Sequence, residues 1–247
     1  VLNGFDAMKE GLVVNGDIVV VILPFSLSSG VIFSNGNIWK QQRRFALSTL
    51  KYFGFGKKSL EPVILDEFTH CAEEIRAYKE KVQAEIDRVI GQSRQPSMED
   101  RANLPYTDAV IHEILRMGNI TPLALPHSTN KEVQLGGYTI PKEVLIIPNI
   151  ASVLFDRKEW ETPFTFNPSH FLNEKGKFAK KTSFIPFSAG KRLCLGENLA
   201  RMELFLFFTS FMQHFTFSMP AGVKVVMDYR AGVTLAPKPY KICITPR

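Results

Sequence analysis

The chain has 247 residues and is 45% apolar, so it is long enough to bury a sizeable core. Its three cysteines, Cys71, Cys194 and Cys243, form no C-x-x-C pair, which argues against a disulfide framework or a structural zinc site. The net charge of +6 favours an acidic partner or an anionic surface. Because the basic residues do not alternate with aromatic ones, we do not expect nucleic acid as a partner.

The early part of the chain predicts two helices around a strand. Asp6 to Leu12 predicts a short helix, and Asp17 to Phe25 is an apolar run rich in β-branched residues, which is typical of a strand. Asn37 is a suitable N-cap for a helix that continues to about Leu50.

The middle of the chain predicts further helices and then a small sheet. Residues Pro62 to Gly91 predict one long helix or two, with an amphipathic second half and Gly91 as a C-terminal cap. The apolar spacing from Tyr106 to Met117 is again helical. From Lys131 to Ile147, short β-rich runs are separated by turn residues, which indicates a small antiparallel sheet.

The last third of the chain ends in short strands. Phe155 to Pro186 is typical of loops, Glu197 to about Phe215 predicts a long apolar helix, and Val223 to Pro246 alternates strand patterns with turns. Together the elements predict a mainly α fold with small β-sheets.

The most informative motif is Phe187-Ser-Ala-Gly-Lys-Arg-Leu-Cys-Leu-Gly196, which places Cys194 on a tight loop before the long apolar helix. Backbone N–H groups and the positive end of the helix dipole favour an ionised thiol there. Such a thiolate can ligate haem iron axially, although a cysteine considered alone is more often a buried small hydrophobe.

Neighbours of this cysteine fit the same hypothesis. Arg192 could pair with a porphyrin propionate, and Phe187 could shield the sulfur from water. Glycines in the loop, Gly196 among them, let the backbone approach a flat macrocycle without a Cβ in the way.

A second motif, Glu113-Ile-Leu-Arg116, brings a carboxylate and a guanidinium to one face of a predicted helix. By itself it is more often an ordinary surface pair. Its position upstream of the cysteine loop, with Phe166-Asn-Pro-Ser-His-Phe171 between them, raises its value.

These three elements, in this order, resemble the cytochrome P-450 family of haem-thiolate monooxygenases. The amino-acid sequences of the Phe166–Phe171 segment and of the helix Ala200–Ser210 are similar to those of the vertebrate microsomal family 2 branch. The resemblance implies an incomplete version of that fold and haem b (iron protoporphyrin IX), with Cys194 as axial iron ligand. It also implies insertion of one atom of O₂ into lipophilic substrates such as xenobiotics, fatty acids and steroids.

The resemblance also implies roles for individual residues. Trp39, Arg43 and His127 match haem-propionate contacts, together with Arg192. Without the resemblance, Trp39 and Arg43 are an amphipathic helix with a snorkelling arginine, and His127 is a satisfied polar residue. A separate structural triad is implied for Glu113, Arg116 and His170.

The match implies one incomplete domain over residues 1–247, with an early block at 4–61, an unmatched junction at 62–77 and a haem-binding block at 78–247. Between the blocks, the family has a long distal helix that carries an acid–threonine pair, and we find no such sequence in this chain. We therefore assign no catalytic residue. A haem-binding or reductase-binding fragment without catalysis stays an alternative, as does a product that does not fold stably.

The implied electron donor is an NADPH-dependent reductase or a small electron carrier, received on a basic surface with Lys40, Arg44 and Lys191. The alternative is that these three basic side chains are solvated and bind no partner. The implied location is the endoplasmic reticulum membrane. The sequence has no run of about 20 apolar residues, which leaves a peripheral or a cytoplasmic location open. The start at Val1, without methionine, suggests a missing upstream part.

Overall fold

The computed structural model describes residues 1–21, 34–52, 80–218, 220 and 229–247. These residues divide between two units, which are described separately. Unit 1 is formed by Val1–Phe53, Asn119–Phe164 and Thr182–Glu197, and unit 2 by Gly54–Gly118, Thr165–Lys181 and Asn198–Arg247. The predicted junction at 62–77 lies outside the described residues, and the single-domain organisation stays a prediction.

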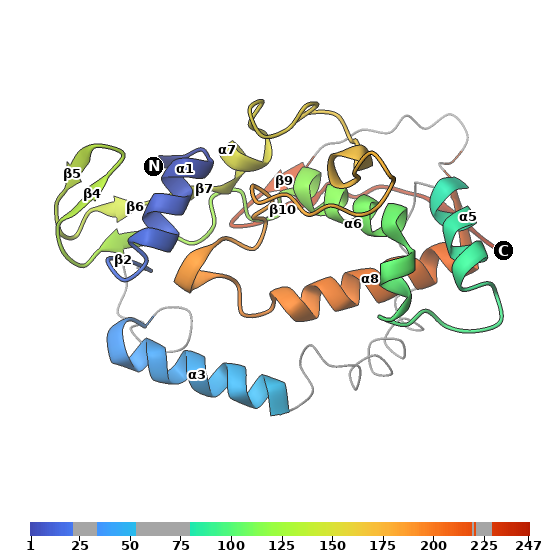
Figure 1. Cartoon of the computed structure of the whole chain (residues 1–247), viewed down its shortest axis with the longest axis horizontal. Coiled ribbons are helices and arrows are strands. Elements are labelled where there is room, and N and C mark those ends of the chain that lie inside the picture. The colour runs from blue at the N-terminus through green and yellow to red at the C-terminus, as the bar shows by residue number, and fades with distance from the viewer. Residues whose placement is uncertain (22–33, 53–79, 219, 221–228) are drawn as a thin grey trace. The chain divides into compact units, whose positions relative to one another are not determined.

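Unit 1 begins with α1 (Phe5–Lys9), which continues directly into the π-helical segment η1 (Glu10–Val14). Helix α3 (Gly36–Tyr52) is the longest element of the unit (Figure 1). Both predicted early helices are thus confirmed, but the second begins at Gly36, so the predicted N-cap Asn37 lies inside it. Of the predicted strand at Asp17–Phe25, the part from Val19 to Val21 is confirmed as β2, and residues 22–25 lie outside the described residues.

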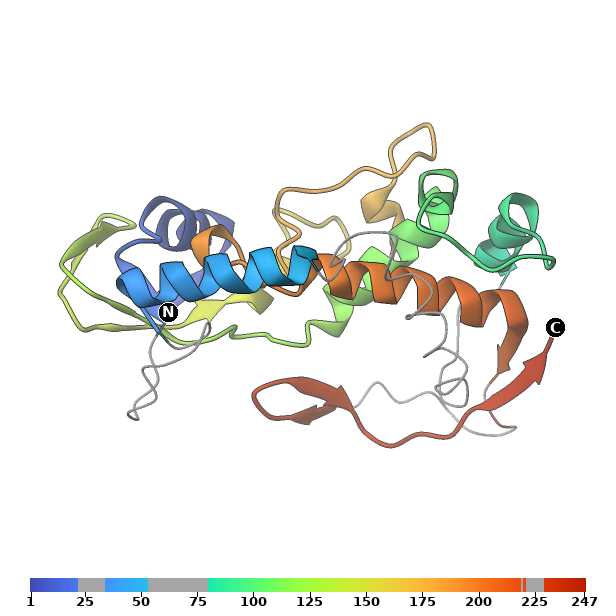
Figure 2. The ribbon, with the colours of Figure 1, turned by 90° about the horizontal axis from the view of Figure 1, so that it is seen from below.

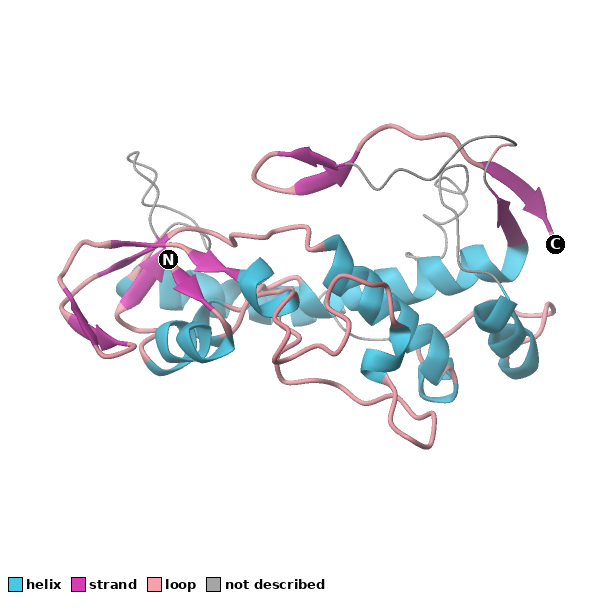
Figure 3. Ribbon diagram, turned by 90° about the horizontal axis from the view of Figure 1, so that it is seen from above, coloured by secondary structure: helices cyan, strands magenta, loops and turns pink. Residues whose placement is uncertain are grey.

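The strands of unit 1 form small separate ladders, as Figure 3 shows. Strand β2 pairs with β3 (His127–Thr129), which pairs with β6 (Leu145–Ile146), and all three are antiparallel neighbours. Strands β4 (Val133–Leu135) and β5 (Tyr138–Ile140) form a hairpin around Gly136 and Gly137, whose positive φ angles of 56° and 78° suit a primed turn. The predicted antiparallel pairing is confirmed. The remaining elements are the parallel pair β1 (Leu2–Asn3) and β7 (Pro148–Asn149), helix α7 (Ile150–Leu154) and the 3-10 turn η5 (Gly190–Arg192).

Three helices build the core of unit 2: α5 (Glu80–Val89), α6 (Pro105–Gly118) and α8, which runs from Glu197 to His214 (Figure 1, Figure 2). Each contributes apolar side chains to one buried cluster, which includes Val82, Ile86, Ile90, Val110, Ile111, Met202, Phe205, Leu206 and Phe211. Gly91 ends α5 with a φ of 74°, as the predicted cap requires.

Short elements complete unit 2. The 3-10 segments η3 (Asp100–Asn103) and η4 (Pro168–Phe171) flank α6, and strand β8 (Phe215–Ser218) pairs with β11 (Cys243–Pro246). Strands β9 (Tyr229–Ala231) and β10 (Leu235–Pro237) form a second antiparallel pair. The mainly α class with small sheets is confirmed. Among the described residues, no helix combines the length and the apolar character needed to cross a membrane.

Candidate functional site

The cysteine loop of unit 1 holds its shape through backbone hydrogen bonds. The Cys194 N–H donates to the Phe187 carbonyl at 3.0 Å, and the Leu193 N–H donates to the Gly190 carbonyl at 3.1 Å. Cys194 is exposed and lies three residues before the first residue of α8. The interpretation of this cysteine as a buried small hydrophobe is therefore wrong for this structure, and its thiol is accessible near a helix N-terminus.

The same loop packs tightly on the π-helical segment η1. Gly190 has a φ of 70°, and a Cβ there would overlap the Leu12 carbonyl oxygen. The adjacent Lys191 forms an ion pair with Asp17. Gly190 is thus required by the chain's own packing. At Gly196, by contrast, the only described neighbour of a Cβ would be Cys194 Sγ at 3.9 Å, so its predicted role beside a macrocycle stays a prediction.

Two guanidinium groups lie over the ring of Trp39. The Cζ of Arg192 is 3.9 Å from the centroid of this ring, and the Cζ of Arg43 is 5.5 Å from it. Arg43 also donates to the Leu193 carbonyl at 3.1 Å, and Arg192 donates to the Asn35 Oδ1 at 2.7 Å. The structure therefore brings these three predicted residues together, beside the residue that precedes Cys194.

The surroundings of the two guanidiniums destabilise their charged forms and so lower their pKa values. Burial and repulsion by Arg43 lower the pKa of Arg192 to about 10. Burial also lowers the pKa of Arg43, and attraction by Cys194 opposes this effect. Neither guanidinium is paired with a carboxylate among the described residues. A partly desolvated pair of like charges favours an anionic ligand that would compensate both.

His127, on β3, is a third candidate contact and is only 2% exposed. Its Nδ1 donates to the Leu125 carbonyl at 2.7 Å, and its Nε2 has no hydrogen-bond partner among the described residues. Burial lowers the pKa of His127 to about 4, and the nearby Arg192 contributes to this shift. A buried ring nitrogen left unsatisfied is a place where a ligand group fits. An exposed thiol and two guanidiniums, all in unit 1, fit an iron ligand and propionate contacts of haem, whereas the free Nε2 is an acceptor in the neutral ring and would join them only when protonated.

Unit 2 contains the second predicted constellation. Arg116 donates to both carboxylate oxygens of Glu113, at 2.7 and 2.8 Å, and the two side chains are fully buried. His170 Nδ1 lies 3.3 Å from the same carboxylate, which also accepts from the Asn167 N–H at 2.8 Å. The ordinary surface-pair interpretation is wrong because both partners are buried. The pKa of His170 is lowered by burial, and attraction by Glu113 opposes this.

A further buried network went unnoticed in the sequence. Asp108 and His112 on α6 contact each other. Asp108 is also bonded to Arg101, and His112 is bonded to Arg201 on α8. The spacing of Asp108 and His112, one helical turn apart, was a signal for the first contact. Nothing in the sequence indicated Arg201.

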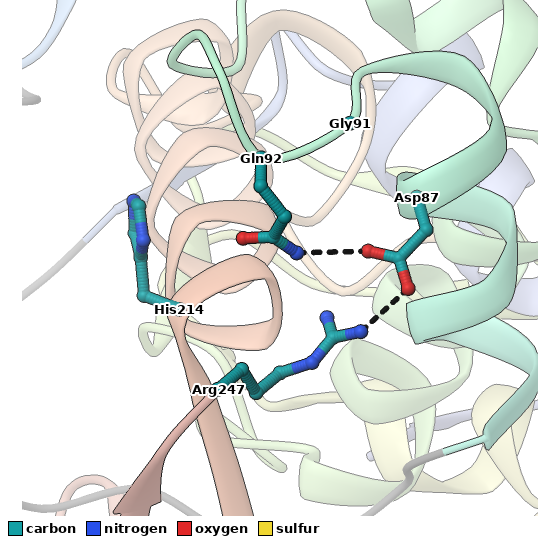
Figure 4. A pocket seen from close by; sticks show the side chains of 5 residues that line it. All are labelled: Asp87, Gly91, Gln92, His214 and Arg247. Atoms are coloured by element: carbon teal, nitrogen blue, oxygen red, sulfur yellow. Dashed lines mark hydrogen bonds and ion pairs between the residues drawn. The ribbon is translucent and has the colours of Figure 1, made fainter.

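Unit 2 also has a shallow polar pocket lined by Asp87, Gly91, Gln92, His214 and Arg247, which Figure 4 shows. The Asp87 carboxylate accepts from both Gln92 and Arg247. Arg247 also donates to carbonyls of the last turn of α8, at Met212 and Gln213. Its charge therefore caps the negative end of that helix. None of the predicted site residues lines this pocket.

The chain is also similar to known proteins. The family model described as cytochrome P-450 matches residues 6–81 and 76–244. Cytochrome P-450 2J1 of Oryctolagus cuniculus is 55% identical over 169 residues, which are 68% of this chain and 34% of the relative. Cytochrome P-450 2J2 of Homo sapiens is 53% identical with the same coverage. Cytochrome P-450 2K1 of Oncorhynchus mykiss is 46% identical over 226 residues, which are 90% of this chain and 42% of the relative. The chain thus spans about a third to two fifths of the length of these relatives.

Proposed function

Because this chain belongs to the cytochrome P-450 family, we propose that it binds haem b, with the Cys194 thiolate as axial ligand of the iron. The observation that carries the proposal is the arrangement around the cysteine loop. Two partly desolvated guanidiniums, Arg43 and Arg192, lie over the ring of Trp39, and Arg43 donates to the carbonyl of Leu193, which precedes the exposed Cys194.

Each of these residues has a definable task. The thiolate of Cys194 would hold the iron of haem, and the N-terminal end of α8 would favour its ionised form. Arg43 and Arg192 hold the propionate carboxylates, while the indole of Trp39 fixes the direction of both guanidiniums. His127 would donate to the same carboxylates only after Nε2 binds a proton, which their negative charge would favour. The ring of Phe187 shields the sulfur. Haem, when bound, supplies the activation of O₂ and the transfer of one oxygen atom to a lipophilic substrate.

The proposed electron donor is an NADPH-dependent reductase or a small electron carrier. Lys40 and Arg44 are exposed on α3, which supports a basic docking surface there. Lys191 is already paired with Asp17, so it adds less net charge to that surface than the sequence suggests. We infer the endoplasmic reticulum membrane as the location, in line with the family 2 relatives.

The carbon monoxide complex of the reduced, haem-reconstituted chain tests haem ligation. A strongly red-shifted Soret band is expected for the chain itself, and the Cys194→Ser variant should bind haem without that band. Cys243→Ser is the matched control, because Cys243 is also exposed but lies on β11 in unit 2. The absence of the band from the unaltered chain, or its persistence in Cys194→Ser, contradicts the proposal.

A second candidate function is a haem-binding or reductase-binding module without catalysis. The lack of an acid–threonine pair in the sequence favours it. This candidate predicts a normal red-shifted band and reductase binding that weakens steeply with salt, but no oxidation of a lipophilic test substrate. Substrate oxidation coupled to NADPH consumption would exclude it in favour of the monooxygenase.

A further inference from the structure

Asn35 connects Arg192 to the beginning of helix α3, and both residues belong to unit 1. Its side-chain Oδ1 accepts a hydrogen bond from Arg192 Nη2 at 2.7 Å, and the carbonyl of the preceding Ser34 accepts from the same nitrogen at 3.2 Å. The carbonyl of Asn35 itself accepts from the Trp39 N–H at 3.3 Å. One residue thus holds the guanidinium and also the first turn of the helix whose indole ring the guanidinium covers.

The contacts of Arg192 fix the orientation of its guanidinium. The bonds to Asn35 and Ser34 use both N–H groups of Nη2. Among the described residues they are the only hydrogen bonds of this guanidinium, so the N–H groups of Nε and Nη1 are available to a ligand. Because the side chain is already held by these bonds and by the Trp39 ring, it loses less conformational freedom when it binds a carboxylate.

Asn35 and Ser34 hold Arg192 without neutralising it. An amide and a peptide carbonyl contribute acceptor oxygens but no negative charge. The positive charge is therefore kept for a ligand, at a place where burial and the neighbouring Arg43 already disfavour it. An aspartate at position 35 would offer the same acceptor oxygen with a negative charge and would form an ion pair within the chain. The neutral amide thus orients the guanidinium and leaves its charge uncompensated.

We propose that Asn35 is a positioning residue for Arg192 in the binding of a haem propionate. Its amide oxygen directs the guanidinium, and its neutrality leaves the charge available to the carboxylate of the ligand. The proposal rests on the proposed function, in which Arg192 contacts haem, but it does not require Cys194 to bind the iron. A merely structural role of Asn35 at the start of α3 is the alternative that the experiment must exclude.

Two substitutions of Asn35 separate orientation from charge. Asn35→Ala removes the acceptor, and the affinity for haem should fall about fivefold. Asn35→Asp keeps an acceptor of the same size, but its carboxylate competes with the propionate, so the affinity should fall at least about tenfold. The urea midpoint of haem-free Asn35→Asp should equal or exceed that of the unaltered chain, because the aspartate pairs with Arg192. Lower affinity without lower stability is the result that a structural role does not produce.

Asn37 provides the matched control, because it is exposed in the first turn of α3 and is not bonded to Arg192. Asn37→Asp adds the same charge nearby and should change the affinity for haem by less than about twofold, since solvent and salt screen an exposed charge. The dimethyl ester of haem, which has no free carboxylate, is a second probe. With this probe, Asn35→Asp and the unaltered chain should bind within about twofold of each other. Absorbance titrations give all affinities.

Several results overturn the positioning role. These are an unchanged affinity in Asn35→Ala or in Asn35→Asp, equal losses in Asn35→Asp and Asn37→Asp, the same loss with the dimethyl ester, or a urea midpoint of Asn35→Asp that falls together with the affinity. The same titrations in the Cys194→Ser background distinguish this role from iron ligation, because the losses should persist there. If the red-shifted band is absent but the losses are found, ligation by Cys194 fails and the role of Asn35 stands. If the unaltered chain binds no haem, both fail.

Discussion

The guanidinium of Arg192 lies closer to the indole of Trp39 than the guanidinium of Arg43 does, at 3.9 Å against 5.5 Å. The two cations share one aromatic ring and repel each other, which contributes to the lowered pKa of Arg192. Trp39 therefore offsets part of this repulsion through its negative ring face, while no carboxylate among the described residues pairs with either arginine. The two guanidiniums of the cluster formed by Trp39, Arg43 and Arg192 are thus preorganised to bind a carboxylate.

Replacement of Arg192 by lysine should weaken haem binding by about tenfold, because a lysine cannot form the planar two-point contact with a carboxylate. Titration of the chain with haem, followed by absorbance, gives the affinity. Arg44→Lys, on the exposed face of α3, is the control and should leave the affinity unchanged. Neither substitution alters the net charge, so an equal effect of both would contradict a specific two-point contact of Arg192 with haem.

The stability of the chain should depend on pH through His127. Its pKa falls from 6.5 in the unfolded chain to about 4 in the folded one, because burial opposes the charged ring. Between these two pH values, His127 is protonated in the unfolded chain but neutral in the folded chain. Stability is therefore complete above pH 6.5 and decreases by about 3 kcal/mol as the pH falls towards 4. Urea unfolding across this range should show the slope, and His127→Gln should flatten it. A slope that persists in His127→Gln assigns the effect to other groups.

Glu113→Gln should destabilise unit 2 strongly. The substitution leaves the fully buried Arg116 without its counter-charge, a change that typically costs about 3–5 kcal/mol. Lys142→Gln breaks the exposed pair of Lys142 and Glu143 and should cost less than about 0.5 kcal/mol. Denaturant midpoints of the two variants give the comparison. Similar midpoints would mean that the buried pair is compensated in a way its geometry does not indicate.

Gly190→Ala should disrupt the cysteine loop. The new Cβ would overlap the Leu12 carbonyl oxygen, and the existing backbone would hold alanine at a positive φ. We therefore expect the free energy of unfolding to fall by at least ~3 kcal/mol. Gly136→Ala also has a positive φ, of 56°, but no described atom lies within 4 Å of its Cβ, and it should cost only ~1 kcal/mol. Thermal unfolding and the haem spectrum together test this pair. Equal losses would place the cause in backbone strain alone.

Local patterns predicted the elements of the fold well where the amphipathic period was long, as in α6 and α8. The cysteine loop and the Glu113–Arg116 spacing were also visible, because both motifs are contiguous in the sequence. The contact of Leu12 with Gly190 and the bond from Arg201 to His112 were not visible. Each joins segments far apart in the chain. Local periodicity and propensity do not predict which distant segment a side chain or loop contacts.

The contact between η1 and the cysteine loop has a consequence for the order in which the molecule assembles. Leu12 is synthesised near the beginning of the chain and Gly190 near its end, so closing this contact costs the entropy of a very long loop. Contacts of this range form slowly compared with local helices. The segment that offers the thiol should therefore mature late, after α6 and α5 have formed. For the same reason the Phe187–Gly196 motif is not portable: grafted without the η1 segment, it would lose the backbone surface that shapes it.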